Sequence, residues 1–113
     1  MAGWIGVDLD GTLAEYNGWK GASQIGAPIP LMVNRVKEWI KNGHTVKIFT
    51  ARVAGHGAEL IGGERVDAIT PIQEWCKTHI GQVLEVTNIK DFGMIELWDD
   101  RAIRVKINTG EVV

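Results

Sequence analysis

Two aspartates one residue apart follow the first apolar run of the chain. The run WIGV, residues 4–7, is followed by DLDGT, residues 8–12. Because residues two apart on an extended chain point to the same side, Asp8 and Asp10 are expected to face one pocket. Gly11 allows the backbone to approach a phosphate closely or to adopt a positive φ angle. Thr12 is placed to begin the turn that follows.

Polar side chains also follow three later predicted strands: Thr50 and Arg52, then Asn88 and Lys90, then Asp99 and Asp100. Ligands of open parallel sheets bind beyond the carboxyl ends of the strands, so these groups are expected at one edge. Taken singly, most have an ordinary explanation as turn formers, helix caps, solvated lysines or surface ion pairs. The pair Asp8 and Asp10 is the exception, and the combination favours a site.

The chemistry that such a site supports is phosphoryl transfer. Clustered carboxylates repel one another unless a cation neutralises them, and Mg²⁺ binds through carboxylates plus a substrate phosphate. A carboxylate can attack phosphorus to form an aspartyl-phosphate. Mg²⁺ and a lysine would stabilise the transition-state charge. A second carboxylate can protonate the leaving alkoxide and later activate water.

The elements that must position these groups alternate between strands and helices. We expect strands at 4–7, 45–49, 82–86 and 95–98, and a helix at 31–42 that ends at Gly43. A second helix begins with Thr70 as N-cap, Pro71 at the first helical position and Gln73 completing a capping box, and ends at Gly81. Residues 13–30 and 53–64 are expected as loops, and the tail as a β-hairpin that turns at 108–110. The predicted fold class is α/β: an open Rossmann-like, mainly parallel sheet flanked by helices.

Length and composition place the chain among ordinary globular domains. Its 113 residues suit one domain, 45% are hydrophobic, 23% are charged, and the net charge is −2. This charge weakly disfavours a nucleic-acid binder that works by bulk electrostatics. The single cysteine, Cys76, excludes an intrachain disulfide and allows a reducing compartment. The sequence shows no signal-peptide pattern and no run of the roughly 20 apolar residues that span a membrane, so we expect a cytoplasmic protein with no membrane partner.

The sequence resembles the haloacid dehalogenase superfamily of Mg²⁺-dependent phosphohydrolases. DLDGT (residues 8–12) resembles its first motif, and IFTAR (48–52) resembles the strand of its second motif, which ends in Ser or Thr. Lys90 is the candidate for the third motif. ELWDD (96–100) resembles the fourth, a strand that ends in paired acids.

The resemblance implies a role for each matching residue. Asp8 would be the nucleophile and a metal ligand, and Asp10 the general acid and base, with its backbone carbonyl on the metal. Thr50 would hydrogen-bond the transferring phosphoryl group, and Lys90 would hold the nucleophile and the phosphate together. Asp99 and Asp100 would bind Mg²⁺, with Asp99 favoured as the direct ligand. Outside the general motifs, Gly11, Thr12 and Arg52 are candidate phosphate or substrate contacts.

The resemblance also implies a capless member, because neither 13–30 nor 53–64 is long enough to form a cap domain. Lys90 lies nine residues before Asp99, which leaves no room for the helix that usually separates the third and fourth motifs. The flap 13–30, a neighbouring subunit or a large substrate would then exclude water from the site. Tyr16 and Trp19 on this flap would either stack on a base or sugar or pin the flap to the core.

The predicted function is a phosphomonoester phosphatase that acts through an aspartyl-phosphate. Its partner is a phosphorylated small molecule, a nucleotide or a polynucleotide end, and a homodimer is plausible. One alternative is an aspartate-phosphorylated signalling module, but its paired acids end the first strand, whereas here they end the fourth. Another is a catalytically inactive scaffold, against which the presence of both Asp8 and Asp10 argues.

Overall fold

The computed structural model describes residues 3–53, 58–61 and 64–113 of the chain. The elements are β1 (Trp4–Val7), α1 (Pro30–Lys41), β2 (Val46–Phe49), the short 3-10 helix η1 (Ala51–Val53), β3 (Ala58–Ile61), β4 (Glu64–Asp67), α2 (Ile69–His79), β5 (Glu85–Thr87) and β6 (Met94–Trp98). In the described part of the chain, no helix is both long and apolar enough to cross a membrane.

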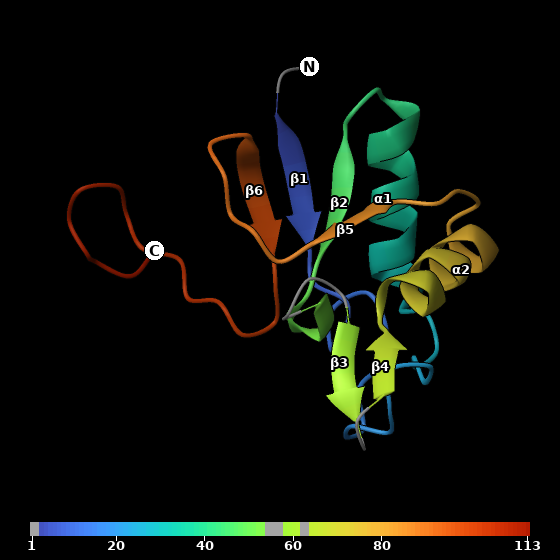
Figure 1. The fold of residues 1–113 in the computed structure, drawn as a ribbon. Coiled ribbons are helices and arrows are strands. Elements are labelled where there is room, and N and C mark those ends of the chain that lie inside the picture. Colours follow the sequence, from blue (N-terminus) through green and yellow to red (C-terminus); the bar gives the residue numbers. More distant parts are fainter. Residues whose placement is uncertain (1–2, 54–57, 62–63) are drawn as a thin grey trace.

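Four strands form one parallel sheet in the order β5-β2-β1-β6 (Figure 1). The predicted α/β class with a parallel, Rossmann-like sheet is therefore confirmed. Helices α1 and α2 connect β1 to β2 and β2 to β5, two steps in the same direction across the sheet. Because crossovers between parallel strands are right-handed, both helices are expected on one face of the sheet.

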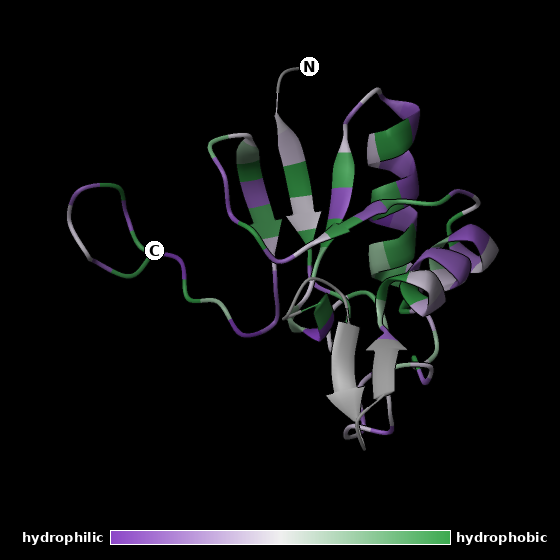
Figure 2. Ribbon diagram, in the orientation of Figure 1, coloured by the Kyte–Doolittle hydropathy of each residue, from purple (hydrophilic) through white to green (hydrophobic). Residues whose placement is uncertain are grey.

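The core lies between this face of the sheet and the two helices. Ile5 and Val7 of β1 and Ile48 of β2 are almost fully buried against Val36 of α1 and Ile72 of α2, in one apolar cluster. Figure 2 shows the apolar bands along these strands and helices. Trp4 lies outside this cluster: its Nε1 donates to Asp91 Oδ1 at 2.8 Å. The link from β5 to β6 thus contacts β1 through Trp4.

Glycines follow the ends of both helices with positive φ as predicted, at Gly43 and Gly81, but the predicted start of α2 is wrong. Helix α1 has Pro30 at its first turn, and Gly43 beyond its end has φ +87°, as expected. Helix α2 is not capped by Thr70, which lies inside the helix. Instead, Asp67 Oδ1 accepts the backbone N–H groups of Ile69 and Thr70 at 2.9 and 3.2 Å. A carboxylate two residues before the helix replaces the predicted hydroxyl because it reaches both free N–H groups.

The expectation of a loop at 53–64 is wrong for the part that the structure describes. Strands β3 and β4 pair in antiparallel fashion as a separate two-stranded sheet. The predicted range also includes residues 54–57 and 62–63, which lie outside the described residues. A glycine pair, Gly62-Gly63, separates the two strands along the chain, and such a pair between short runs favours a hairpin.

Two other expectations are met in part. Strand β5 begins at Glu85, three residues later than predicted, and pairs with β2 through only three residues. The tail turns where predicted, with positive φ at Asn108 and Gly110, and Val105 bridges Val112. However, the tail forms no regular strand and does not join the parallel sheet. Residues 13–29 contain no helix or regular strand, as expected of the flap, and α1 begins at Pro30.

Candidate functional site

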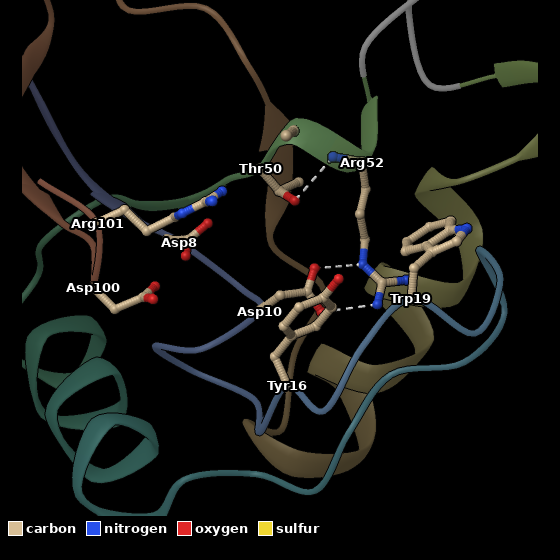
Figure 3. Close-up of a pocket in the computed structure, with 9 residues that line it drawn as sticks. Asp8, Asp10, Tyr16, Trp19, Thr50, Arg52, Asp100 and Arg101 are labelled. Atoms are coloured by element: carbon tan, nitrogen blue, oxygen red, sulfur yellow. Dashed lines mark hydrogen bonds and ion pairs between the residues drawn. The ribbon is translucent and has the colours of Figure 1, made fainter.

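A cavity of about 510 Å³ lies at the carboxyl ends of the parallel strands. It is lined by Asp8, Asp10, Tyr16, Trp19, Thr50, Ala51, Arg52, Asp100 and Arg101. These residues follow β1, β2 and β6 or belong to the flap 13–30, so segments far apart in sequence meet there (Figure 3). Asp8 and Asp10 both face this one pocket, as their spacing predicted.

The three acidic residues Asp8, Asp99 and Asp100 form a cluster that we call the acid cluster. Their carboxylate oxygens lie within 4.8 Å of one another. The pairing of β1 with β6 creates the cluster, since Val7 is opposite Trp98 and Asp8 N–H donates to Trp98 O at 2.9 Å. The register of two neighbouring strands therefore aligns residue 8 with residues 99 and 100.

Burial and the neighbouring carboxylates both act on Asp8. The pKa of Asp8 is raised from 3.8 to about 7, first by burial, then by a hydrogen bond with Asp100, and then by the negative charges of Asp99, Asp100 and Asp10. The pKa of Asp100 is lowered, mainly by the hydrogen bond from Thr12. Without a bound cation, Asp8 thus holds a proton more tightly than Asp100 does.

Two residues of the turn after β1, Gly11 and Thr12, contact the acid cluster. Gly11 has φ +90°, and a Cβ at this position would lie 2.8 Å from Asp100 Oδ2. Thr12 Oγ1 donates to Asp100 Oδ1 at 2.9 Å, accepts the Asp100 N–H at 3.0 Å, and lies 3.4 Å from Asp8 Oδ2. Neither residue is among those that line the cavity. The two predicted substrate contacts thus position carboxylates in this structure.

Asp10 and Arg52 form a paired group at the other side of the cavity. Arg52 Nε donates to Asp10 Oδ2 at 2.7 Å, and Arg52 Nη2 donates to Asp10 Oδ1 at 2.8 Å. The same guanidinium donates to the carbonyls of Ala22 and Gln24 in the flap, at 3.2 and 2.8 Å. Arg52 is 6% exposed. Sequence reasoning placed Arg52 at the substrate but did not foresee that it holds Asp10 and the flap.

Thr50 lies in the cavity wall at the end of β2, between these two groups (Figure 3). It is 3% exposed, and its hydroxyl oxygen accepts the Arg52 N–H at 3.2 Å. Its own N–H donates to Thr87 O at 3.0 Å, which fixes it to β5. With one hydrogen bond accepted, the hydroxyl still has its proton to donate to a phosphoryl oxygen.

A positively charged side chain, Arg101, lies at the acid-cluster end of the cavity. It is not among the site residues predicted from the sequence. Arg101 lines the cavity next to Asp8 and Asp100 (Figure 3), and its N–H donates to Asp99 Oδ1 at 2.8 Å. No described residue forms an ion pair with its guanidinium. Lys90 is exposed and is not among the residues that line the cavity. Arg101 directly follows the paired acids Asp99 and Asp100, and this position was the signal in the sequence that could have identified it.

The acid cluster has the donor chemistry that a hard divalent cation requires. Three carboxylates within 4.8 Å supply oxygen ligands, one of them on a buried strand end and two on the neighbouring strand end. Burial and then the neighbouring carboxylates raise the pKa of Asp8, and a bound cation would offset both effects. Asp8, Asp99 and Asp100 are thus the described residues that fit Mg²⁺, whereas the Asp10 side chain is turned toward Arg52.

Comparisons with known proteins inform the fold alone. The structure is similar to that of a conserved protein from Bacteroides thetaiotaomicron, with a TM-score of 0.62 and 20% sequence identity. The match covers 90% of this chain and 78% of that protein. No family model matches the chain, and no curated protein matches it. The chain thus shares a three-dimensional architecture with that bacterial protein.

Proposed function

We propose that this protein is a Mg²⁺-dependent phosphomonoester hydrolase of the haloacid dehalogenase type. One observation carries the proposal: one carboxylate oxygen from each of Asp8, Asp99 and Asp100 lies within 4.8 Å of the others. Asp8 and Asp100 of this cluster line one end of the cavity, whereas Asp99 lies outside its lining. Two strands that are far apart in sequence supply these groups, and Thr50 and Arg101 face the same space. This combination of acids, a hydroxyl and a cation suits a phosphate held by a metal ion.

Asp8 is the proposed nucleophile. A bound Mg²⁺ would neutralise the acid cluster and the phosphate, which leaves Asp8 ionised at neutral pH. Its free carboxylate oxygen then attacks phosphorus, and the bond from phosphorus to the alkoxide oxygen breaks. Water then attacks the phosphorus of the aspartyl-phosphate, which releases inorganic phosphate and restores the carboxylate. The first step requires one proton for the leaving alkoxide, and the second step removes one proton from the attacking water.

Asp10 is the proposed carrier of that proton. Both of its carboxylate oxygens accept hydrogen bonds from Arg52 in this structure, so one oxygen must leave Arg52 when the substrate enters. In its carboxylic acid form Asp10 gives its proton to the alkoxide, and the resulting carboxylate takes a proton back from the attacking water, which restores the acid form. Arg52 therefore serves as the positioning residue for the acid and base.

Arg101 is proposed to bind the phosphate oxygens. It is the arginine on the acid cluster side of the cavity, whereas Arg52 is occupied by Asp10 and two carbonyls. A guanidinium donates two parallel hydrogen bonds to a phosphate. The third-motif role of Lys90 remains a prediction, and we expect Arg101→Ala to reduce kcat/KM more than Lys90→Ala does.

The experiment is hydrolysis of p-nitrophenyl phosphate by the purified chain with Mg²⁺. Activity is expected with Mg²⁺ and should disappear with EDTA or in Asp8→Asn. Glu38→Gln, which removes an exposed carboxylate on α1, is the matched control and should retain activity. An acid-stable, hydroxylamine-sensitive phosphoprotein should accumulate in Asp10→Asn, because its second step lacks a base.

Three results would contradict the proposal in different ways. Hydrolysis by Asp8→Asn would exclude the covalent route. Full activity in EDTA would exclude the metal ion. Stable phosphorylation of the wild-type chain by a small phosphodonor, without turnover of phosphomonoesters, would favour the signalling module instead.

A further inference from the structure

The two ends of the cavity differ in chemistry. Figure 3 shows Asp8, Asp100 and Arg101 at one side, and Tyr16 and Trp19 at the other, beside the pair of Asp10 and Arg52. One end therefore suits a phosphate and a metal ion, and the other offers aromatic surface. A cavity of about 510 Å³ lies in the range of pockets that hold a whole organic ligand rather than a bare phosphate.

Tyr16 and Trp19 do not fix the flap to the core. Tyr16 is 49% exposed and Trp19 is 50% exposed, and neither belongs to the core cluster. The flap is fixed by other bonds: Arg52 binds two of its carbonyls, and Trp75 Nε1 donates to Gly26 O at 3.0 Å. The aromatic pair thus lines the cavity and lies outside the apolar core.

Trp19 is also oriented. The Arg52 guanidinium carbon lies 4.8 Å from the centroid of a Trp19 ring, a cation–π contact. Since Arg52 is buried and fixed by four side-chain hydrogen bonds, it holds the indole in place at the cavity wall. A rigid, half-exposed indole beside a polar site is a surface on which flat rings stack.

We propose that the organic part of the substrate carries a flat aromatic or heteroaromatic ring, as a nucleoside monophosphate does. The ring stacks on Trp19 and Tyr16 while its phosphate lies at the acid cluster. This inference rests on the proposed function for the position of the phosphate, but the ring preference can be measured without turnover.

The test uses two ligands that differ only by the base: adenosine 5′-monophosphate and ribose 5-phosphate. Calorimetric titration of Asp8→Asn in the presence of Mg²⁺ should show about tenfold tighter binding of the nucleotide, in line with one stacked base. Trp19→Ala in this background should reduce that ratio about tenfold. Trp19→Phe should keep most of it, and Lys20→Ala, an exposed position on the same flap, should keep all of it.

The outcomes separate the two proposals. Equal affinity for the two ligands, or an unchanged ratio in Trp19→Ala, would overturn the ring inference. A ring preference in a wild-type protein that hydrolyses neither ligand would support the inference and overturn the phosphatase. Failure of the wild-type chain to bind either ligand in the presence of Mg²⁺ would overturn both.

A second inference rests on a different part of the chain, the tail 101–113. Every residue of the tail is exposed. Its apolar residues Ile103, Val105 and Ile107 are 77%, 51% and 85% exposed and alternate with Arg104 and Lys106. Figure 1 shows the tail leaving the body of the molecule, and Figure 2 shows its alternation of apolar and hydrophilic residues. A period of two with one apolar side is typical of a strand that packs against a partner.

The surface area of the chain indicates how much a partner would cover. The accessible surface is 7401 Å², whereas a compact monomer of 12.4 kDa exposes about 6,100 Å². The radius of gyration is 14.7 Å, against about 13.3 Å expected for 113 residues. The excess of about 1,300 Å² exceeds the roughly 800 Å² that each partner buries in a stable complex.

The acid cluster directs the tail away from its own sheet. Asp100 is bonded to Thr12, and Asp99 accepts the Arg101 N–H, so the chain direction after β6 is fixed. Strand β6 ends the sheet, and no described strand pairs with its outer edge. We infer that the tail of each chain pairs with the outer edge of β6 in a second copy. The exchange is reciprocal and closes as a two-fold dimer.

Sedimentation velocity over a range of concentrations tests the dimer. The wild-type chain should form a dimer, and the variant Ile103→Ser/Val105→Ser/Ile107→Ser should be a monomer with an unchanged far-UV circular dichroism spectrum. The variant Arg104→Ser/Lys106→Ser alters the other side of the tail and should remain a dimer. A monomeric wild type at all concentrations, or a dimer that survives the triple change, would overturn the inference.

Discussion

At the scale of single residues, the acid cluster depends on two residues of the turn that follows β1. Gly11 leaves room for the Asp100 carboxylate, and the Thr12 hydroxyl orients it. These are the fourth and fifth residues of the DLDGT segment. Their side chains, or the lack of one, thus determine where a carboxylate of a different strand lies.

Gly11→Ala should therefore weaken metal binding. A Cβ would lie 2.8 Å from Asp100 Oδ2 and would also be strained at φ +90°, with a cost in unfolding free energy of about 1 kcal/mol. Gly43→Ala is the matched control, because Gly43 has φ +87° and nothing within 4 Å of a Cβ. Calorimetric titration with Mg²⁺ should show at least tenfold weaker binding in Gly11→Ala alone. Equal Mg²⁺ affinity in the two variants would contradict this role of Gly11.

The raised pKa of Asp8 predicts how stability depends on pH without a metal ion. The folded state binds the Asp8 proton more tightly than the unfolded state does, so the stabilisation is complete below about pH 4 and is lost as the pH rises through about 7. Because Asp8 is half-buried, we expect a loss of only about 1–2 kcal/mol. Urea unfolding in EDTA should show this fall between about pH 4 and 7, and Asp8→Asn or added Mg²⁺ should abolish it. A flat profile for the wild type in EDTA would contradict the prediction.

The pair of Asp10 and Arg52 predicts a larger effect on stability. Arg52→Met leaves the Asp10 carboxylate and two flap carbonyls without their donors, at a cost of about 2–4 kcal/mol in unfolding free energy. The double variant Asp10→Asn/Arg52→Met should recover part of that loss, because it removes the unpaired charge. Thermal unfolding measures the loss of stability, and limited proteolysis at residues 13–30 measures the release of the flap. A double variant less stable than Arg52→Met would show that the charge is not the cause.

At the scale of elements, the site depends on how short strands and helices begin and end. The start of α2 is an example, because Asp67 at the end of β4 accepts two of its backbone N–H groups. This contact joins the β3–β4 hairpin to the helix that covers β5. The capping residue therefore lies in a segment that sequence reasoning assigned to no element.

Asp67→Ala should destabilise α2 by about 1 kcal/mol, the usual cost of a lost N-cap. Thr70→Ala should cost less, since Thr70 is a residue of the helix whose N–H remains bonded to Asp67. The pKa of Asp67 is lowered by hydrogen bonds from Thr70 and Ile69, so this contribution is present at neutral pH and is lost in acid. Chemical unfolding of both variants at pH 7 compares them. A larger loss in Thr70→Ala would favour the capping box instead.

At the scale of the whole molecule, one apolar cluster joins all the elements that position the site. Ile48 is fully buried in this cluster between β1, α1 and α2. Ile48→Ala should reduce the unfolding free energy by about 2–5 kcal/mol. Native-state hydrogen exchange should show the same loss in β1, β2 and α1, because these elements unfold together. A loss confined to β2 would indicate separate folding units.

The sequence alone determined what depends on local chemistry. The apolar runs predicted β1, β2 and β6 to within one residue, glycines marked both helix ends, and the alternation of strands and helices gave the parallel sheet. It also placed Asp8, Asp10 and Thr50 at one edge, because the carboxyl ends of parallel strands lie together.

Tertiary structure alone decided which side chains meet. The register of β1 against β6 brings Asp8 to Asp99 and Asp100, and the fold of the flap brings its carbonyls to Arg52. It also aimed Asp10 at Arg52, and placed Arg101 in the cavity and Lys90 outside its lining. Contacts between residues 28 or more positions apart leave no periodicity or cap signal in the sequence, so only the packing of the whole chain specifies them.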